Sequence, residues 1–148
     1  MWPLLGIAVV VAGFALRLNG LNYQYWEASF DSAARLDSKK VTASGSVDQF
    51  NLSPKKRDPN IGLRFTGVIQ LPADGAYTFY TSSDDGPVLY LGPQKVADND
   101  GIHGTTERKG TITLKAGAHP ILVNYFNGGG EAVLKVSYEG PGLKKQEI

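Results

Sequence analysis

The sequence predicts an all-β fold, an antiparallel β-sandwich or barrel, with one transmembrane helix at its amino terminus. From residue 62 onward, short stretches of alternating apolar and polar residues recur between clusters of Gly, Pro and Asp, which is typical of strands that bury one face. The 148 residues include 18 Gly and 8 Pro, the composition of a turn-rich domain. The first 16 residues contain no charged side chain. We therefore expect a transmembrane anchor at 1–18 and a β-sandwich domain at 19–148.

The apolar leader is long enough to cross a membrane once. The segment from Leu4 to Leu16 is almost wholly aliphatic, and the first charge is Arg17. A helix over residues 1–18 would rise about 27 Å, slightly less than the hydrocarbon core of a bilayer. A cleaved secretory signal looks similar, but signals normally open with Lys or Arg, and this segment has neither before Arg17. We expect an uncleaved single-pass anchor, with the carboxyl-terminal domain periplasmic or extracellular.

The leader also suggests a partner. Small residues in a membrane helix let a second helix approach closely, although bacterial membrane helices use many Ala and Gly in any case. We expect other membrane-protein subunits to contact this helix and the surface of the β-domain. The small residues of the leader are Gly6, Ala8, Ala12, Gly13 and Ala15.

The first part of the domain combines one strand with long connections. An early strand is expected at 21–26. Residues 31–60 are rich in Ser, Lys, Asp and Asn and show no sustained period, so they are assigned to surface connections with one short helix at 32–36.

The remaining strands follow from alternation between turn residues. Leu63, Phe65 and Ile69 fall on one parity, so we expect them on a buried face, and a turn at 72–75 ends that strand. Further strands are expected at 77–80, 88–91, 111–115, 121–126 and 133–138. The aromatic residues assigned to packing in the domain are Tyr23, Tyr25, Trp26, Tyr77, Phe79 and Tyr125.

Two consecutive aspartates, Asp84 and Asp85, form the candidate metal site. Neighbouring side chains of an extended strand point to opposite faces, so both carboxylates reach one ion only if the backbone bends, as a cis peptide would arrange. Ca²⁺ suits such a site because it takes about six to eight oxygen ligands in a flexible shell. Asn127, at the start of a glycine-rich loop, would supply a further oxygen. The alternative is a solvated turn, because Ser-Asp-Asp-Gly is also common turn chemistry.

A second acidic cluster, Asp98-Asn99-Asp100-Gly101, lacks the Glu that would close a calcium loop. We expect it to be a turn stabilised by its own Asx side chains. His103 lies in the same loop, and its expected role is hydrogen bonding within that loop.

An ordered set of fragments spans residues 20–141, and it includes Phe65-Thr66-Gly67, Asp74-Gly75-Ala76-Tyr77-Thr78-Phe79, Ser83-Asp84-Asp85-Gly86 and Leu114-Lys115-Ala116-Gly117. This set resembles the PA14 domain family. This resemblance implies a β-sandwich or barrel-like fold, usually outside the cytoplasm, of the kind found in toxins, adhesins and glycosidases. Several sugar-binding members hold Ca²⁺ through adjacent aspartates, with sugar hydroxyls completing the coordination, which would make Asp84 and Asp85 both metal and carbohydrate ligands; other members have no known ligand.

Composition and motifs exclude several classes of function. The net charge is +1 and no basic block exceeds Lys55-Lys56-Arg57, so a nucleic-acid partner is not expected. The chain has no Cys, which excludes disulfides, iron–sulfur clusters and thiol nucleophiles. The motifs Gly-x-Ser-x-Gly, His-Glu-x-x-His and Gly-Lys-Ser/Thr are all missing, so we expect no enzymatic activity.

Two functional hypotheses remain. The first is an accessory subunit whose helix docks in a membrane assembly, such as a respiratory or photosynthetic complex, while the β-domain braces its partners. The second is a tethered, Ca²⁺-dependent lectin that reads a glycan through Asp84 and Asp85. The two are compatible, and the sequence places assembly first.

Overall fold

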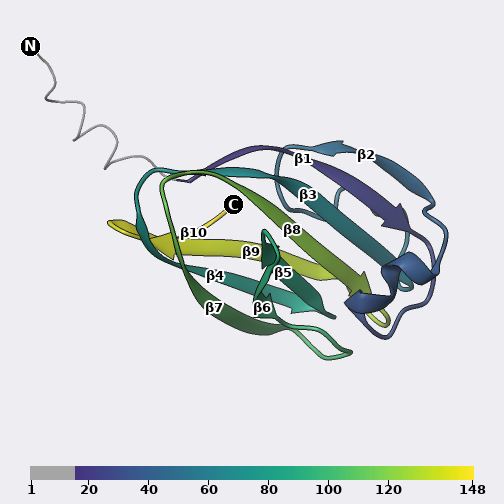
Figure 1. Cartoon of the computed structure of the whole chain (residues 1–148). Helices are drawn as coiled ribbons and strands as arrows, with labels where there is room; N and C mark the ends of the chain where they lie inside the picture. Colours follow the sequence, from purple (N-terminus) through teal and green to yellow (C-terminus); the bar gives the residue numbers. More distant parts are fainter. Residues whose placement is uncertain (1–15) are drawn as a thin grey trace, which may run out of the picture.

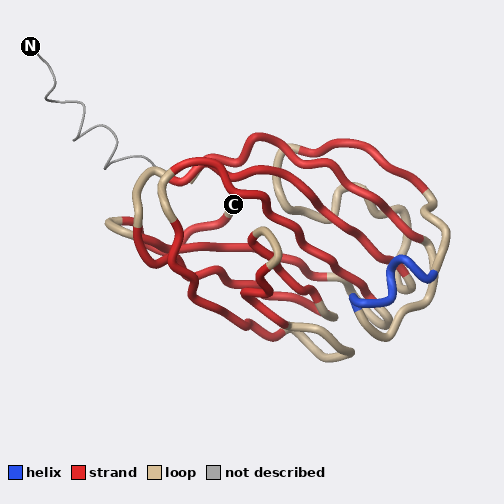
Figure 2. Tube along the Cα trace, in the orientation of Figure 1, coloured by secondary structure: helices blue, strands red, loops and turns tan. Residues whose placement is uncertain are grey.

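The computed structural model describes residues 16–148, which form a sandwich of two antiparallel sheets (Figure 1). The six-stranded sheet has the order β2-β1-β3-β8-β5-β6, and the four-stranded sheet has the order β10-β9-β4-β7. One short 3₁₀ helix, η1, lies at one end of the sandwich (Figure 2). The elements are β1 (Arg17–Trp26), η1 (Ala33–Ser38), β2 (Ala43–Val47), β3 (Ile61–Leu71), β4 (Gly75–Asp84), β5 (Pro87–Leu91), β6 (Gln94–Asp98), β7 (Thr106–Leu114), β8 (Gly117–Asn127), β9 (Val133–Gly140) and β10 (Leu143–Glu147).

The predicted all-β antiparallel sandwich is confirmed, and so is the prediction that alternate residues of β3 share one buried face. Leu63, Phe65 and Ile69 of β3 are all fully buried, because alternate residues of a strand share one face. Phe65 meets Phe50 edge to face, with ring centroids 5.6 Å apart. The aromatic residues assigned to packing are buried as well, apart from Tyr23, which is partly buried against the core.

The segment 31–60 is more structured than the sequence indicates. The expected short helix is present as η1, and the Ser32 hydroxyl caps it by accepting a hydrogen bond from the Ala34 amide at 3.1 Å. The assignment of the whole remainder to surface connections is wrong, because β2 pairs with β1. β2 consists of small residues, and its two apolar ones, Ala43 and Val47, are only partly buried against the core. This alternation is too weak to identify the strand from the sequence, and the strand is recognised by its pairing with β1. The strands β6 and β10 are also additional to those expected.

The expected anchor at 1–18 overlaps the domain at its end. Arg17 and Leu18 belong to β1, where they pair with Gln70 and Ile69 of β3. The apolar side chain of Leu18 packs against the sandwich core, which explains why this residue is part of the domain. The other part of the proposed anchor, 1–15, lies outside the described residues. Within 16–148, no helix combines the length and apolar character needed for a membrane span.

The strand register places the candidate site at the end of the sandwich opposite to Leu16. In β1, Arg17 pairs with Gln70 at one end and Trp26 pairs with Gly62 at the other. The next residue pair along β3 and β8 is Ile61 with Asn127, so Asn127 lies at the Trp26 end. Figure 1 shows η1 at this same end and the beginning of β1 at the other.

Candidate functional site

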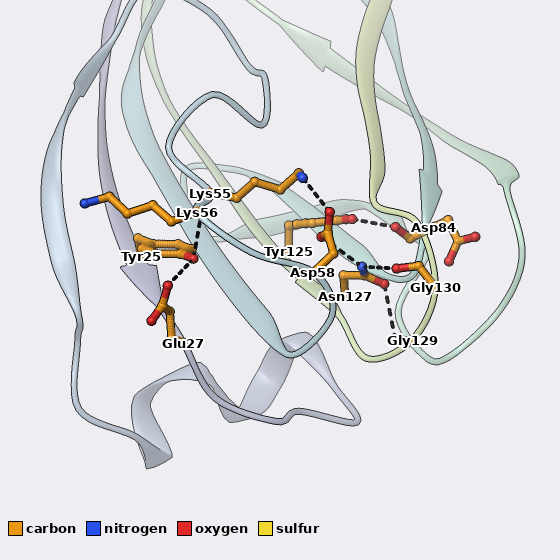
Figure 3. A network of polar contacts seen from close by, with 10 residues as sticks. All are labelled: Tyr25, Glu27, Lys55, Lys56, Asp58, Asp84, Tyr125, Asn127, Gly129 and Gly130. Atoms are coloured by element: carbon orange, nitrogen blue, oxygen red, sulfur yellow. Dashed lines mark hydrogen bonds and ion pairs between the residues drawn. The ribbon is translucent and has the colours of Figure 1, made fainter.

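The predicted metal ligands lie where two strands, β4 and β8, end. Asp84 is the last residue of β4, Asp85 follows it in the connection to β5, and Asn127 is the last residue of β8. Tyr125 of β8, which is fully buried, donates its hydroxyl to the Asp84 carbonyl oxygen at 2.5 Å. This bond joins the ends of β4 and β8, and Figure 3 shows Tyr125 and Asn127 on neighbouring sides of the same cluster.

Asp85 is a buried carboxylate with a fixed orientation. Its exposed fraction is 2%, and the peptide bond between Asp84 and Asp85 is cis, the arrangement considered in the sequence analysis. Its Oδ1 accepts a hydrogen bond from the His103 amide at 2.9 Å, and its Oδ2 accepts one from the Gly128 amide at 2.7 Å. Asp85 therefore connects the 99–104 loop to the glycine-rich loop, while each oxygen keeps a further lone pair.

The electrostatics of the pair are those of two adjacent negative charges. Burial raises the pKa of Asp84, and the hydrogen bond and charge of Asp85 raise it further, whereas the nearby His103 lowers it. Within residues 16–148, neither aspartate forms an ion pair with Lys or Arg. The charge of this pair is therefore left without a Lys or Arg partner.

Asn127 is held so that its amide nitrogen points away from solvent. The side chain is fully buried, and Nδ2 donates to the Gly130 carbonyl at 3.0 Å and to Asp58 Oδ1 at 3.3 Å. Its Oδ1 accepts from the Gly129 amide at 3.3 Å (Figure 3). Asp58 is itself paired with Lys55 at 2.5 Å. These contacts fix which end of the amide is oxygen, so Oδ1 is the atom available as a ligand.

His103 forms the loop hydrogen bonds expected of it. Its Nδ1 contacts the Gly104 carbonyl and its Nε2 contacts the Asn99 carbonyl, both at 2.7 Å. Burial lowers the pKa of His103, but the two carbonyl oxygens and the charges of Asp85 and Asp84 outweigh it, so the net direction is upward.

The second acidic cluster is an Asx-stabilised turn, as expected, and it also holds the loops around the site. The Asp100 amide donates to Asp98 Oδ1 at 3.1 Å. The Asp100 carboxylate accepts from the Ser32 hydroxyl at 2.6 Å and from the Ala33 amide at 2.7 Å. No sequence motif connects Asp100 with η1, because the two are far apart along the chain and only the fold brings them together.

Asn99 is a second residue that the sequence analysis did not assign to the site. It is 3% exposed, and its Nδ2 donates to the Thr106 carbonyl at 2.8 Å and to Ser83 Oγ at 3.1 Å. Ser83 in turn donates to the Asp85 carbonyl at 2.7 Å. Asn99 thereby supports the backbone on which Asp85 is carried.

A hollow of about 410 Å³ borders the glycine-rich loop at Gly128, and neither Asp84 nor Asp85 lines it. It reaches Gly128, whose amide holds Asp85, and Ile102, which is 66% exposed. The hollow is lined by Ser29, Phe30, Asp31, Arg35, Ser38, Lys39, Ile102 and Gly128.

The donor set suits Ca²⁺ better than a transition metal. The part of the chain that the structure describes contains no group of three or more His, Cys, Asp and Glu side chains placed to hold a metal. Oxygen from Asp84, Asp85 and Asn127, with backbone carbonyls, is instead the hard donor set that Ca²⁺ prefers. The residues present therefore fit the ion implied by the sequence resemblance.

The chain is similar to several known proteins. The anti-sigma-I factor RsgI3 of Acetivibrio thermocellus is 28% identical over 138 residues, which are 88% of this chain and 21% of that protein. The chain thus spans about a fifth of the length of this curated relative. An anti-sigma factor domain-containing protein from Clostridium clariflavum is 27% identical, with a TM-score of 0.73 over 89% of this chain and 46% of that one.

A more distant structure shares the fold. A PA14 sugar-binding domain from an RTX adhesin superposes with a TM-score of 0.69 at 22% identity, covering 87% of this chain and 94% of the other. The family model described as the PA14 domain matches residues 18–148. This chain belongs to the PA14 domain family.

Proposed function

We propose that this domain is a non-enzymatic, Ca²⁺-dependent carbohydrate-binding module, with the ion held by Asp84, Asp85 and Asn127. The observation that supports it most strongly is the charge of the aspartate pair. Asp85 is buried, Asp84 is its neighbour, and among the described residues neither is neutralised by Lys or Arg. A buried negative charge of this kind is costly unless a cation balances it, and a divalent ion in the cluster would do so.

The protein's own residues would orient the ligands. The amides of His103 and Gly128 fix the Asp85 carboxylate, and Gly129 and Gly130 fix the Asn127 amide. Bound Ca²⁺ would supply open coordination positions for sugar hydroxyls. The hollow that borders Gly128 would accommodate a part of the glycan that extends past the glycine-rich loop.

The position of the site in the fold supports recognition outside the cytoplasm by an anchored domain. The site lies at the Trp26 end of β1, whereas the leader joins at the Arg17 end. If 1–15 are a membrane anchor, the aspartates would face away from the bilayer, where a periplasmic or extracellular glycan could reach them. The absence of an enzymatic role is favoured by the two most similar relatives described above, whose names denote anti-sigma factors rather than enzymes.

Calorimetry tests the proposal. Titration of the full chain with CaCl₂ should give a saturable signal that is lost in Asp84→Asn. The matched control is Asp48→Asn, an exposed aspartate outside the site and the loops around it. Screening on a glycan array should then give binding in Ca²⁺ that EDTA removes. A wild-type domain that binds no Ca²⁺ would refute the proposal.

The accessory-subunit hypothesis is the second candidate, and the uncharged leader favours it. The sequence alone places it first, but two aspartates without a Lys or Arg partner favour a ligand-binding role more specifically. In this alternative the leader and the domain surface would contact other subunits, for example in a respiratory or photosynthetic complex. Native purification should then recover stoichiometric partners, and replacing residues 1–15 should release them. Purification of the native protein without partners would exclude this role.

A further inference from the structure

The edge strand β2 differs from the other strands at the sheet edges. The edges of the two sheets are β2, β6, β10 and β7. Proteins commonly protect such edges with charged residues, since unpaired backbone groups there are free to pair with another strand. Among the edge strands of residues 16–148, only β2 has no charged residue. The charges of the others are Lys95 and Asp98 in β6, Glu107, Arg108 and Lys109 in β7, and Lys144, Lys145 and Glu147 in β10.

The free side of β2 is open, and its sequence is symmetric. Ser44, Gly45 and Ser46 are all exposed, and the strand is paired on its other side with β1. Reading outward from Gly45, each direction meets a serine and then a small apolar residue, Ala43 or Val47. A strand of this kind is chemically complementary to itself when it runs in the opposite direction.

We propose that β2 is an association surface for a second copy of this chain. The two β2 strands would pair antiparallel about a two-fold axis at Gly45. Ser44 would then lie opposite the partner's Ser46, and Ala43 would lie opposite the partner's Val47. The two six-stranded sheets would continue into each other across this contact.

Self-complementarity is the reason for choosing a second copy as the occupant. A two-fold interface uses one patch twice, so its residues must match their own image, as those of β2 do. A charged peptide would find no counter-charge in Ala43–Val47. Five residues on each side form a small contact, so the dimer should be weak and depend on concentration.

The serines are suitable positions for a test because both are exposed. Gly45 is not suitable, since a Cβ there would lie 2.8 Å from the Tyr23 hydroxyl oxygen. In the proposed register, Ser44→Lys with Ser46→Lys would place lysine opposite lysine at both serine positions. In contrast, Ser44→Lys with Ser46→Glu would place lysine opposite glutamate, with the same number of substitutions.

The experiment is sedimentation equilibrium of the full chain in density-matched detergent. The wild type should dimerise as its concentration rises, the Lys/Lys variant should associate about tenfold more weakly or worse, and the Lys/Glu variant should retain the dimer. Mixing the Lys/Lys variant with a Glu/Glu variant should restore association. Circular dichroism checks that each variant is folded. If the Lys/Lys variant does not fold, the Glu/Glu variant by itself replaces it in the test, because it places like charges opposite each other in the same way.

Three results would overturn the inference. One is a wild type that stays monomeric at all concentrations. Another is a dimer that persists unchanged in the Lys/Lys variant, which would indicate contact through another segment, including the leader. The third is loss of the dimer in the Lys/Glu variant while the wild type retains it, because parallel pairing would place like charges opposite each other.

Discussion

Arg64 and Asp37 form an ion pair with two hydrogen bonds that fastens η1 to the six-stranded sheet. Arg64 Nη1 donates to Asp37 Oδ1 and Nη2 donates to Oδ2, both at 2.9 Å. The same guanidinium donates through Nε to Asn124 at 2.8 Å and lies 5.5 Å from the centre of the Trp26 ring. The residues at the start of η1 also donate hydrogen bonds to the Asp100 carboxylate. The ion pair between Arg64 and Asp37 therefore helps to position the loop that contains Asp100, close to the two aspartates.

We predict that Asp37→Asn lowers stability in a pH-dependent way. The hydrogen bond from Arg64 lowers the pKa of Asp37 below its ordinary value of 3.8. A lowered pKa in the folded state contributes stability above the unfolded value, and that contribution is lost as the pH falls through the folded value. Because Asp37 is largely exposed, the cost at pH 7 should be at most about 1 kcal/mol.

Urea unfolding of wild type and Asp37→Asn at pH 7 and below pH 3.8 tests this prediction. The difference between their free energies of unfolding should be smaller at the lower pH. Asp98→Asn is a matched control, because Asp98 contacts only Lys95, at 3.4 Å, among ion-pair partners in the described chain. An equal difference at both pH values would contradict the role of the Arg64 pair.

We predict that Gly86→Ala disturbs the loop that holds Asp85. A Cβ at residue 86 would lie 2.7 Å from Asp100 Cα and 2.8 Å from the Gly101 amide nitrogen, both backbone atoms. The loop must shift, which should cost about 1–3 kcal/mol and weaken any Ca²⁺ binding. Gly104→Ala, in the facing 99–104 loop, is the control, since nothing lies within 4 Å of its Cβ position. Thermal unfolding and calcium calorimetry of both variants would decide, and equal behaviour of the two would count against the steric argument.

We predict that Asn99→Ala is strongly destabilising. The substitution removes the donor shared by Thr106 and Ser83 and leaves their oxygens without that partner in a buried site. Loss of such bonds costs about 1–3 kcal/mol. Asn22→Ala, at an exposed position, should cost much less. Chemical denaturation compares the two, and similar midpoints would show that the Asn99 network does not stabilise the fold.

We predict that Tyr125→Phe affects both stability and the site. Burial raises the pKa of Tyr125, so the hydroxyl stays protonated and donates to Asp84 at 2.5 Å. Removing it should cost about 1–2 kcal/mol and weaken Ca²⁺ binding by freeing the Asp84 backbone. Tyr138→Phe removes a comparable buried hydroxyl at the far end, where it accepts from the Leu16 amide at 2.9 Å.

Denaturation and calcium calorimetry of the two tyrosine variants distinguish an effect on stability from an effect on Ca²⁺ binding. Both should be less stable than wild type, while only Tyr125→Phe should change the calcium titration. A change of equal size in both titrations would mean that the effect comes through general stability.

Strands with regular apolar alternation could be predicted from the sequence, and those without it could not. The alternation of Leu63, Phe65 and Ile69 identifies β3, because it places all three apolar side chains on the one face of the strand that is buried. In contrast, β2 has only small and polar residues between Ala43 and Val47, so its position depends on the edge of β1. Local pattern therefore indicates burial, whereas strand pairing depends on residues elsewhere in the chain.

The same division applies to the candidate site. The sequence by itself determined the all-β class, the neighbouring Asp84 and Asp85, and the placement of Asn127 beside a glycine-rich loop, because these follow from composition and from residues adjacent in the chain. Only the tertiary structure decided that Asp100 holds η1 and that Asp85 joins two loops. These contacts depend on how the strands are aligned, and that alignment is set by the packing of the two sheets as a whole.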